Sequence, residues 1–241
     1  MLLIGQGSTR SSRPDELLSR HAATLEGRGR FAEVGAAVLA GGPSLREALA
    51  RIRARRVIIV PVFMCDGVLC REALPAALRA AGECRPDGHA FYMCPPVGMH
   101  PAIADLIVEC AEAALMKHAL TPTAATLLVI GHGSTRDPAS ESAVALQTER
   151  IRATSKFHGV TTAFISQPPL LEDVLAGIKD PAIGVALFSA RGNHVVEDIE
   201  KKFTRDKGRT LVFAGAIGED DRIVDIIDHL AGEKISSFGY D

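Results

Sequence analysis

The same sequence pattern occurs twice in this chain, once at the start and once just past the middle. The first copy reads MLLIGQGSTRSSRPD (1–15) and the second reads TLLVIGHGSTRDPAS (126–140). Further pairs follow at nearly constant spacing: Phe63 with Phe188, Gly67 with Gly192, and Gly98 with Gly218. Self-similarity over more than half of each copy indicates a duplicated domain, so the chain is expected to fold as two related halves.

Each copy alternates short apolar runs with amphipathic segments. A run such as RVIIVPVF (56–63) is typical of a strand buried on both faces of a sheet. A segment such as DELLSRHAATLEG (15–27) has its apolar residues at helical spacing and ends on glycine. We expect strands at 2–5, 32–40, 56–63, 89–94, 125–131, 159–165, 182–188 and 210–214, and helices at 15–27, 43–55, 71–82, 100–118, 137–154, 169–178, 195–204 and 219–231.

This alternation predicts an α/β fold with two similar domains, each a four-stranded parallel sheet flanked by helices. The segment LTPTAA (120–125) has the composition of a linker. We therefore expect an N-terminal domain at 1–121 and a C-terminal domain at 122–241. In open sheets of this kind, ligands bind beyond the carboxyl ends of the strands.

Composition excludes several classes of protein. The net charge is −2 with scattered basic residues, which gives no reason to expect a nucleic-acid partner. No run of 18 uncharged apolar residues occurs and the chain begins on a strand-like run, so we expect neither a membrane span nor a signal peptide. The five cysteines lack zinc-finger spacing and are typical of reduced thiols in a cytoplasmic protein, with Cys65 and Cys70 as a weaker candidate for a soft metal.

Two histidines of the second copy are the leading candidates for chemistry. His132 lies between two glycines directly after a predicted strand, and His194 follows the third strand of the same copy. Because the carboxyl ends of neighbouring parallel strands meet at one edge, we expect both imidazoles to share one cleft. Neutral imidazole is a good ligand for divalent cobalt, iron, nickel and zinc. Glu197 and Asp198 follow His194, and either could orient its ring or simply favour the start of a helix.

Other chemistries have weaker support in the sequence. No GxSxG elbow occurs, so Ser134 lacks the setting of a hydrolase nucleophile, and the P-loop and the full dinucleotide fingerprint are also missing. A phosphate held at the GHGSTR turn by backbone N–H groups and Arg136 stays open. The remaining histidines are expected to be solvated or packed, except that His100 begins a predicted helix and could face the cleft.

The motif LLVIGHGSTRDP, followed in the same copy by ALFSARGNHVVEDI, resembles the class II tetrapyrrole chelatases. The sirohydrochlorin cobaltochelatase and ferrochelatase type, CbiX and SirB, matches best, and the resemblance covers nearly the whole chain. It implies a cytoplasmic lyase of cobalamin or siroheme biosynthesis that works as a monomer or homodimer without an organic cofactor. Its substrates would be a small-molecule tetrapyrrole, such as sirohydrochlorin, and a divalent metal ion, Co²⁺ or Fe²⁺, with Ni²⁺ as a further candidate.

The resemblance also implies roles for individual residues. His132 and His194 would bind the incoming metal and help to remove the pyrrole protons, and Glu197 is a further candidate for proton handling because the family glutamate is missing. The arginines would pair with substrate carboxylates, because guanidinium binds carboxylate in a bidentate manner. The expected substrate-binding residues are Gln6, Arg10, Ser134, Arg136 and Arg191.

The sequence departs from the family pattern in two ways. In the first copy, Gln6 and Leu69 stand where the second copy has its histidines, which suggests that only the second copy binds metal. The glutamate that the family often has at the end of strand 2 is replaced by Ala40 in one copy and Ser166 in the other. A non-catalytic tetrapyrrole- or metal-binding protein derived from a chelatase is therefore the alternative function.

Overall fold

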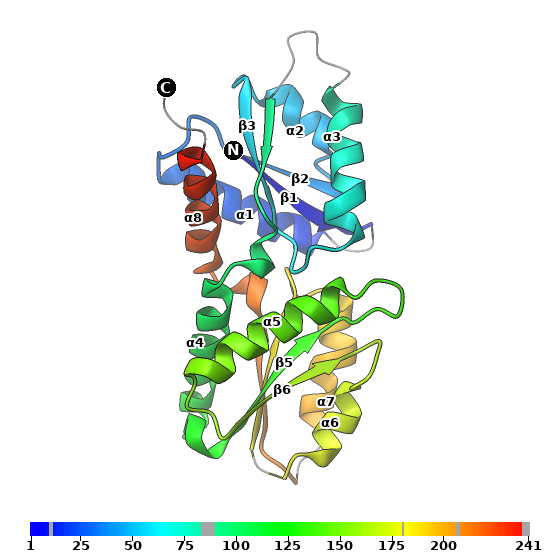
Figure 1. Ribbon diagram of the computed structural model, residues 1–241, viewed down its shortest axis with the longest axis vertical. Coiled ribbons are helices and arrows are strands. Elements are labelled where there is room, and N and C mark those ends of the chain that lie inside the picture. Colours follow the sequence, from blue (N-terminus) through cyan, green and yellow to red (C-terminus); the bar gives the residue numbers. More distant parts are fainter. Residues whose placement is uncertain (10–11, 83–89, 180, 206–207, 238–241) are drawn as a thin grey trace. The chain divides into compact units, whose positions relative to one another are not determined.

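The computed structural model of the chain describes residues 1–9, 12–82, 90–179, 181–205 and 208–237. Each copy of the repeat forms a four-stranded, all-parallel sheet, with strand orders β2-β1-β3-β4 and β6-β5-β7-β8 (Figure 1). The strands are β1 (Leu2–Gly7), β2 (Gly35–Ala40), β3 (Arg56–Pro61), β4 (Ala90–Met93), β5 (Thr126–Gly131), β6 (Gly159–Phe164), β7 (Ala182–Ala186) and β8 (Leu211–Ala216). The predicted α/β class and the two-sheet architecture are confirmed.

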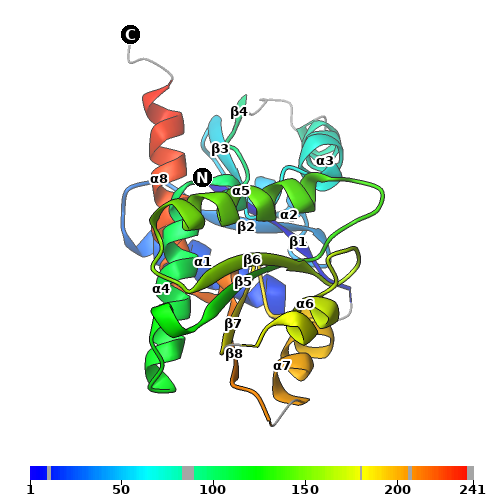
Figure 2. The ribbon, with the colours of Figure 1, turned by 60° about the horizontal axis from the view of Figure 1, so that its bottom comes forward.

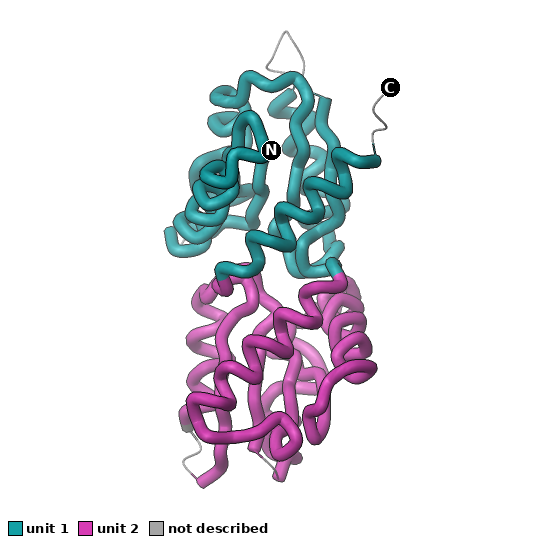
Figure 3. The backbone as a smooth tube through the Cα atoms, turned by 90° about the vertical axis from the view of Figure 1, so that its left-hand side faces the viewer, with its two compact units in different colours: residues 1–100, 221–241 teal, residues 101–220 magenta. Residues whose placement is uncertain are grey.

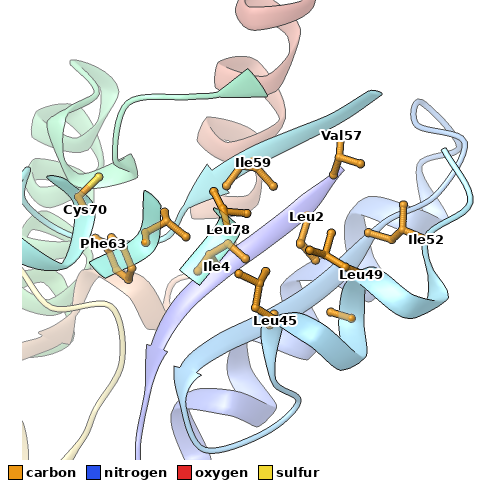
Figure 4. Packing of buried hydrophobic residues seen from close by; sticks show 13 residues of the cluster. Leu2, Ile4, Leu45, Leu49, Ile52, Val57, Ile59, Phe63, Cys70 and Leu78 are labelled. Atoms are coloured by element: carbon orange, nitrogen blue, oxygen red, sulfur yellow. The ribbon is translucent and has the colours of Figure 1, made fainter. Parts of the chain in front are cut away.

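Helices cover both faces of the first sheet. Helices α1 (Arg13–Gly27) and α8 (Ile223–Ser236) lie on one face, and α2 (Leu45–Arg51) and α3 (Leu74–Gly82) lie on the other. Figure 4 shows the second of these cores, where Leu2, Ile4 and Ile59 of the sheet meet Leu49 and Leu78 of the helices. The inner strands β1 and β3 are buried along nearly their whole length, which explains why their sequences are continuously apolar.

The second sheet is covered in the same way (Figure 2). Helices α4 (Ala102–Lys117) and α5 (Ala139–Thr154) lie on one face, and α6 (Leu171–Gly177) and α7 (Lys201–Arg205) lie on the other. Among the residues that the structure describes, no helix combines the length and apolar character needed to cross a bilayer.

The last helix of each copy packs on the sheet of the other copy. Helix α4 follows β4 of the first sheet along the chain, yet it contacts β7, β8 and α5; helix α8 follows β8 and contacts β3 and α1. The compact units are therefore residues 1–100 with 221–241, which we call unit 1, and residues 101–220, which we call unit 2 (Figure 3). This differs from the expected division at residue 121, because the buried apolar side chains of α4 find their cover in the second sheet.

Both copies place a π-helical turn directly after the third strand and its loop. These turns are η1 (Leu69–Ala73) and η4 (Val195–Glu200), where the sequence predicts ordinary helix at 71–82 and 195–204. The wider turns occur at corresponding positions, and α7 is the short α-helical remainder in the second copy. Turns of this kind are often found at functional sites, and His194 stands at the first position before η4.

Candidate metal site

The loop after β5 places His132 at the carboxyl edge of the second sheet. The strand ends at Gly131, and the backbone then turns through Gly133, whose φ of 78° lies in the left-handed region that favours glycine. A Cβ at Gly133 would also lie 2.6 Å from the Cγ of the buried Gln167, so no larger residue fits this turn. The turn at Gly133 therefore keeps His132 out of the core, and the His132 side chain is exposed.

His132 and His194 lie side by side in unit 2. Their ring centroids are 4.9 Å apart, and the ring planes cross at 81°. The second imidazole comes from the loop after β7, which neighbours β5 in the sheet, so the strand order itself brings the two residues together. Both rings are exposed and therefore accessible to a dissolved ion.

Each ring uses its Nδ1 atom for a contact with the protein. Nδ1 of His132 lies 2.8 Å from the carbonyl oxygen of Gly133, and Nδ1 of His194 lies 2.8 Å from Oδ2 of Asp198. Both partners are acceptors, so Nδ1 carries the hydrogen in each ring. Nε2 is then the atom with the lone pair in both, which is the arrangement found in metal-ligating histidines.

Of the two acidic residues after His194, Asp198 makes the contact with the imidazole. The pair is spaced i, i+4 across η4, which brings the carboxylate to the Nδ1 atom of the ring. Glu197 instead binds the ammonium group of Lys201. Sequence reasoning put Glu197 in the site, and the geometry gives the orienting position to its neighbour.

Comparison with known proteins adds the family. The CbiX family model matches residues 1–114 and 126–234, which is most of the chain and both copies of the repeat. The chain belongs to the CbiX family. A curated relative in Halobacterium salinarum, named "Probable sirohydrochlorin cobaltochelatase", is 25% identical over 99% of this chain and 92% of its own length.

Solved structures of the CbiX and SirB kind share the fold. A structure titled as CbiX, the terminal enzyme for biosynthesis of siroheme in denitrifying bacteria, has a TM-score of 0.78 and 24% identity, covering 99% of both chains. SirB from Bacillus subtilis with Fe³⁺ has a TM-score of 0.76 and 16% identity, covering 100% of this chain and 97% of its own. This chain also matches 55% of the length of a multidomain Deinococcus radiodurans protein described as similar to chelatases, with a TM-score of 0.77 at 23% identity and coverage of 97% of this chain.

Ser166 stands next to the first imidazole, at the position where the resemblance predicts a carboxylate. The backbone N–H of Ser166 donates to the carbonyl oxygen of His132 over 3.0 Å, which ties the end of β6 to this loop. The Ser166 hydroxyl lies 3.4 Å from Nδ1 of His132, a long contact compared with a normal hydrogen bond. The position is therefore beside the ring, but it offers a neutral hydroxyl where the family often has an anion.

The first copy has lost both imidazoles at corresponding places. Burial fixes the alignment, because Cys70 and Leu74 are buried just as Val195 and Ile199 are. This alignment makes Leu69 the position that corresponds to His194, and Leu69 is exposed at the start of η1. Gln6 is likewise exposed near the end of β1. Among the described residues, the pair of adjacent imidazoles at the carboxyl edge of a sheet is therefore found in unit 2, and the corresponding places in the first copy hold Gln6 and Leu69.

Most backbone N–H groups of the GHGSTR turn already donate hydrogen bonds within the protein. Gly133 donates to the hydroxyl of Ser140 over 3.1 Å, and Ser134 donates to Oε1 of Gln167 over 2.5 Å. The N–H groups of Arg136 and Asp137 both donate to the Ser134 hydroxyl, at 3.2 Å each. This network gives Ser134 a role in holding the turn, and it argues against the open alternative of a phosphate site.

The expected substrate-binding residues Arg136, Arg191 and Ser134 differ in exposure and in their hydrogen-bond partners. The Arg136 side chain is exposed on the same loop as His132. The Arg191 guanidinium is bound to Glu200, and this partner raises the pKa of Arg191. Ser134 serves the turn through its hydroxyl, and Arg10 lies outside the described residues. Of the two arginines that the structure describes, Arg136 and Arg191, the first is therefore the stronger candidate for contact with an anionic substrate.

Sequence reasoning missed the buried Gln167. Its amide oxygen accepts from Ser134, and its amide nitrogen donates to Glu141 over 2.9 Å, so it links the loop after β5 to helix α5. The residue is only 8% exposed, so its role is to hold the loop in place through these hydrogen bonds rather than to contact a ligand. The available signal was a polar residue placed between a strand end and two prolines, which alone does not distinguish support from solvent exposure.

Among the described residues, Cys65 and Cys70 belong to no group of three or more metal-ligating side chains. Burial raises the pKa of the Cys70 thiol to about 12 and that of Cys94 to about 11, so both thiols are poor nucleophiles near neutral pH. We expect iodoacetamide at about pH 8 to leave Cys70 and Cys94 unmodified in the folded protein, while the half-buried Cys65 reacts. Peptide mass spectrometry with and without denaturant measures this. Equal labelling of Cys70 in both conditions contradicts the assignment.

Proposed function

We propose that this protein inserts a divalent metal ion, Co²⁺ or Fe²⁺, into sirohydrochlorin or a closely related tetrapyrrole. The observation that carries the proposal is the pair of adjacent imidazoles, His132 and His194, each with Nε2 as its lone-pair nitrogen. Membership of the CbiX family supplies the substrate class. The relative named a probable cobaltochelatase and the SirB structure with iron favour the two metals.

The proposed chemistry exchanges one metal ion for two pyrrole N–H protons. A divalent ion held by two neutral nitrogens is bound weakly enough to be released to four ring nitrogens. An imidazole that gives up the ion regains its lone pair and can accept a proton near neutral pH. Asp198 then stabilises the imidazolium form of His194, as a carboxylate does when it orients a catalytic histidine.

The direct test follows metal insertion into sirohydrochlorin by its visible spectrum, with Co²⁺ and Fe²⁺ in separate reactions. We expect steady product formation well above the spontaneous rate with at least one of the two ions. Failure with both ions, while a known chelatase works in the same assay, contradicts the proposal. The alternative function, a non-catalytic binder descended from a chelatase, predicts sirohydrochlorin binding with no turnover, and the missing family glutamate at Ser166 favours it.

Replacing Asp198 separates the orienting residue from its neighbour. Asp198→Asn keeps the size of the side chain but removes the charge facing His194, so we expect Co²⁺ affinity at this pair to fall about 10–100-fold, the usual cost of losing a partner that orients a metal-ligating histidine. Glu197→Gln is the matched control, because that carboxylate contacts Lys201. Equal losses in the two variants contradict the assignment of roles.

A further inference from the structure

Unit 1 contains a second cluster of metal-ligating side chains. His100 ends the short 3₁₀ turn η2 (Val97–Met99), while His229 and Glu233 lie one turn apart on α8. The first residue is far from the other two in the sequence, and η2 contacts α8 in the fold. Neither histidine belongs to the His132 pair, which lies in unit 2.

The geometry of the cluster suits a single ion. Nε2 of His229 lies 3.3 Å from Oε1 of Glu233, and the rings of His100 and His229 lie 5.4 Å apart at 77°. The candidate ligand atoms of all three residues lie within 4.8 Å of one another. Bonds from nitrogen or oxygen to a transition metal are about 2.0–2.2 Å long, so ligand atoms around one tetrahedral ion lie roughly 3.3–3.6 Å apart. Side-chain rotations of the exposed His229 and Glu233 toward His100 would close this difference.

The backbone around the cluster is well packed, while His100 is half-buried and the side chains of His229 and Glu233 are exposed. The N–H of Gly98 donates to Phe63 over 2.9 Å, which anchors η2, and Ile226, Ile227 and Leu230 bury the inner face of α8. The side chains of His229 and Glu233 are 62% and 58% exposed. The packed backbone of η2 and α8 therefore fixes the Cα positions of the three ligands. The exposed side of the cluster leaves further coordination positions of a bound ion open to water.

We propose that His100, His229 and Glu233 form a second divalent metal site, selective for a first-row transition metal such as Zn²⁺ or Co²⁺. Two imidazoles and one carboxylate are the donor set of many three-ligand zinc sites that keep an open position. Mg²⁺ and Ca²⁺ prefer oxygen ligands and bind such a set poorly. A His–Glu pair spaced i, i+4 is common on helices, but here a third ligand arrives from a separate segment, which distinguishes the cluster from an ordinary surface ion pair.

The test is calorimetric titration of the full chain with Zn²⁺ alone. We expect two classes of site in the unmodified protein. His229→Ala removes one of the three direct metal ligands. The Zn²⁺ affinity of the unit 1 site is therefore expected to fall more than about 100-fold, which exceeds the usual effect of losing a residue that only orients a ligand. Glu233→Gln, which keeps the helix surface almost unchanged, is expected to weaken the same class. His118→Ala is the matched control, because His118 is an exposed histidine at the end of α4.

A second arm separates this proposal from the proposed function. The double variant His132→Ala with His194→Ala is expected to keep the unit 1 class, whatever happens to chelatase activity. Unchanged Zn²⁺ stoichiometry and affinity in both His229→Ala and Glu233→Gln, with melting temperatures like that of the unmodified protein, overturn the second site. Loss of binding only in the double variant also overturns it, because that result places all bound metal in unit 2.

Discussion

Alanine at His132 or at His194 is expected to lower the rate of metal insertion into sirohydrochlorin by about 10²–10⁴-fold, the usual range for loss of a group that transfers protons in the transition state. Each change removes both a metal ligand and a proton acceptor from the carboxyl edge of the second sheet. Both side chains are exposed, so the melting temperature is expected to stay close to that of the unmodified protein. Initial rates from the visible spectrum, with Co²⁺ and Fe²⁺ run separately, measure the effect.

The two histidines are expected to act as one unit. The double variant is therefore predicted to be little slower than either single variant, since groups that share one task are strongly non-additive. His118→Ala is the control for loss of a surface histidine, and it is expected to keep full activity. If either single variant inserts metal as fast as His118→Ala, the assignment of the pair is wrong.

Alanine at Gly218 is expected to cause the largest loss of stability among single substitutions near the site. A Cβ there would lie 2.1 Å from the carbonyl oxygen and 2.4 Å from the carbonyl carbon of Ser189. These are backbone atoms that cannot rotate away, so the loop after β7 must shift, and such overpacking costs about 1–3 kcal/mol or more of unfolding free energy. For a chain of this size, each kcal/mol corresponds to about 2–4 °C in melting temperature.

The same substitution is expected to disturb the site, because Ser189 begins the loop that leads to His194. Co²⁺ affinity of unit 2 should therefore fall together with the melting temperature. Gly177→Ala is the matched control: Gly177 ends α6, and no atom lies within 4 Å of a Cβ built there. If the melting temperature of Gly218→Ala equals that of Gly177→Ala, the predicted clash of a Cβ at position 218 with the Ser189 backbone is wrong.

The duplicated fold could be predicted because strand and helix patterns depend on local periodicity. Continuous apolar runs at 56–63 and 125–131 correspond to inner strands with both faces covered. The exchange of α4 and α8 could not be predicted in this way. An amphipathic helix shows which of its faces is buried, and the sequence does not say which of two similar sheets covers that face.

The sequence predicts which loops carry the candidate site, but it does not predict which acidic side chain contacts His194. His132 and His194 follow neighbouring strands, so topology alone brings them to one edge. Glu197 and Asp198 are adjacent in the sequence, and only the π-helical turn η4 decides that the second faces the ring. His229 was expected to be solvated or packed, and His100 to begin a helix that could face the cleft. Their contact could not be predicted, because nothing local links the turn before α4 to the middle of α8.

Two imidazoles of unit 2 are expected to hold one metal ion. A crystal structure of the His229→Ala variant with Co²⁺, using anomalous scattering at the cobalt edge, tests it without interference from unit 1. The account predicts one cobalt peak bonded to Nε2 of both His132 and His194, at about 2.1 Å from each. A peak bonded to neither ring, or to one ring with the other turned away, contradicts it.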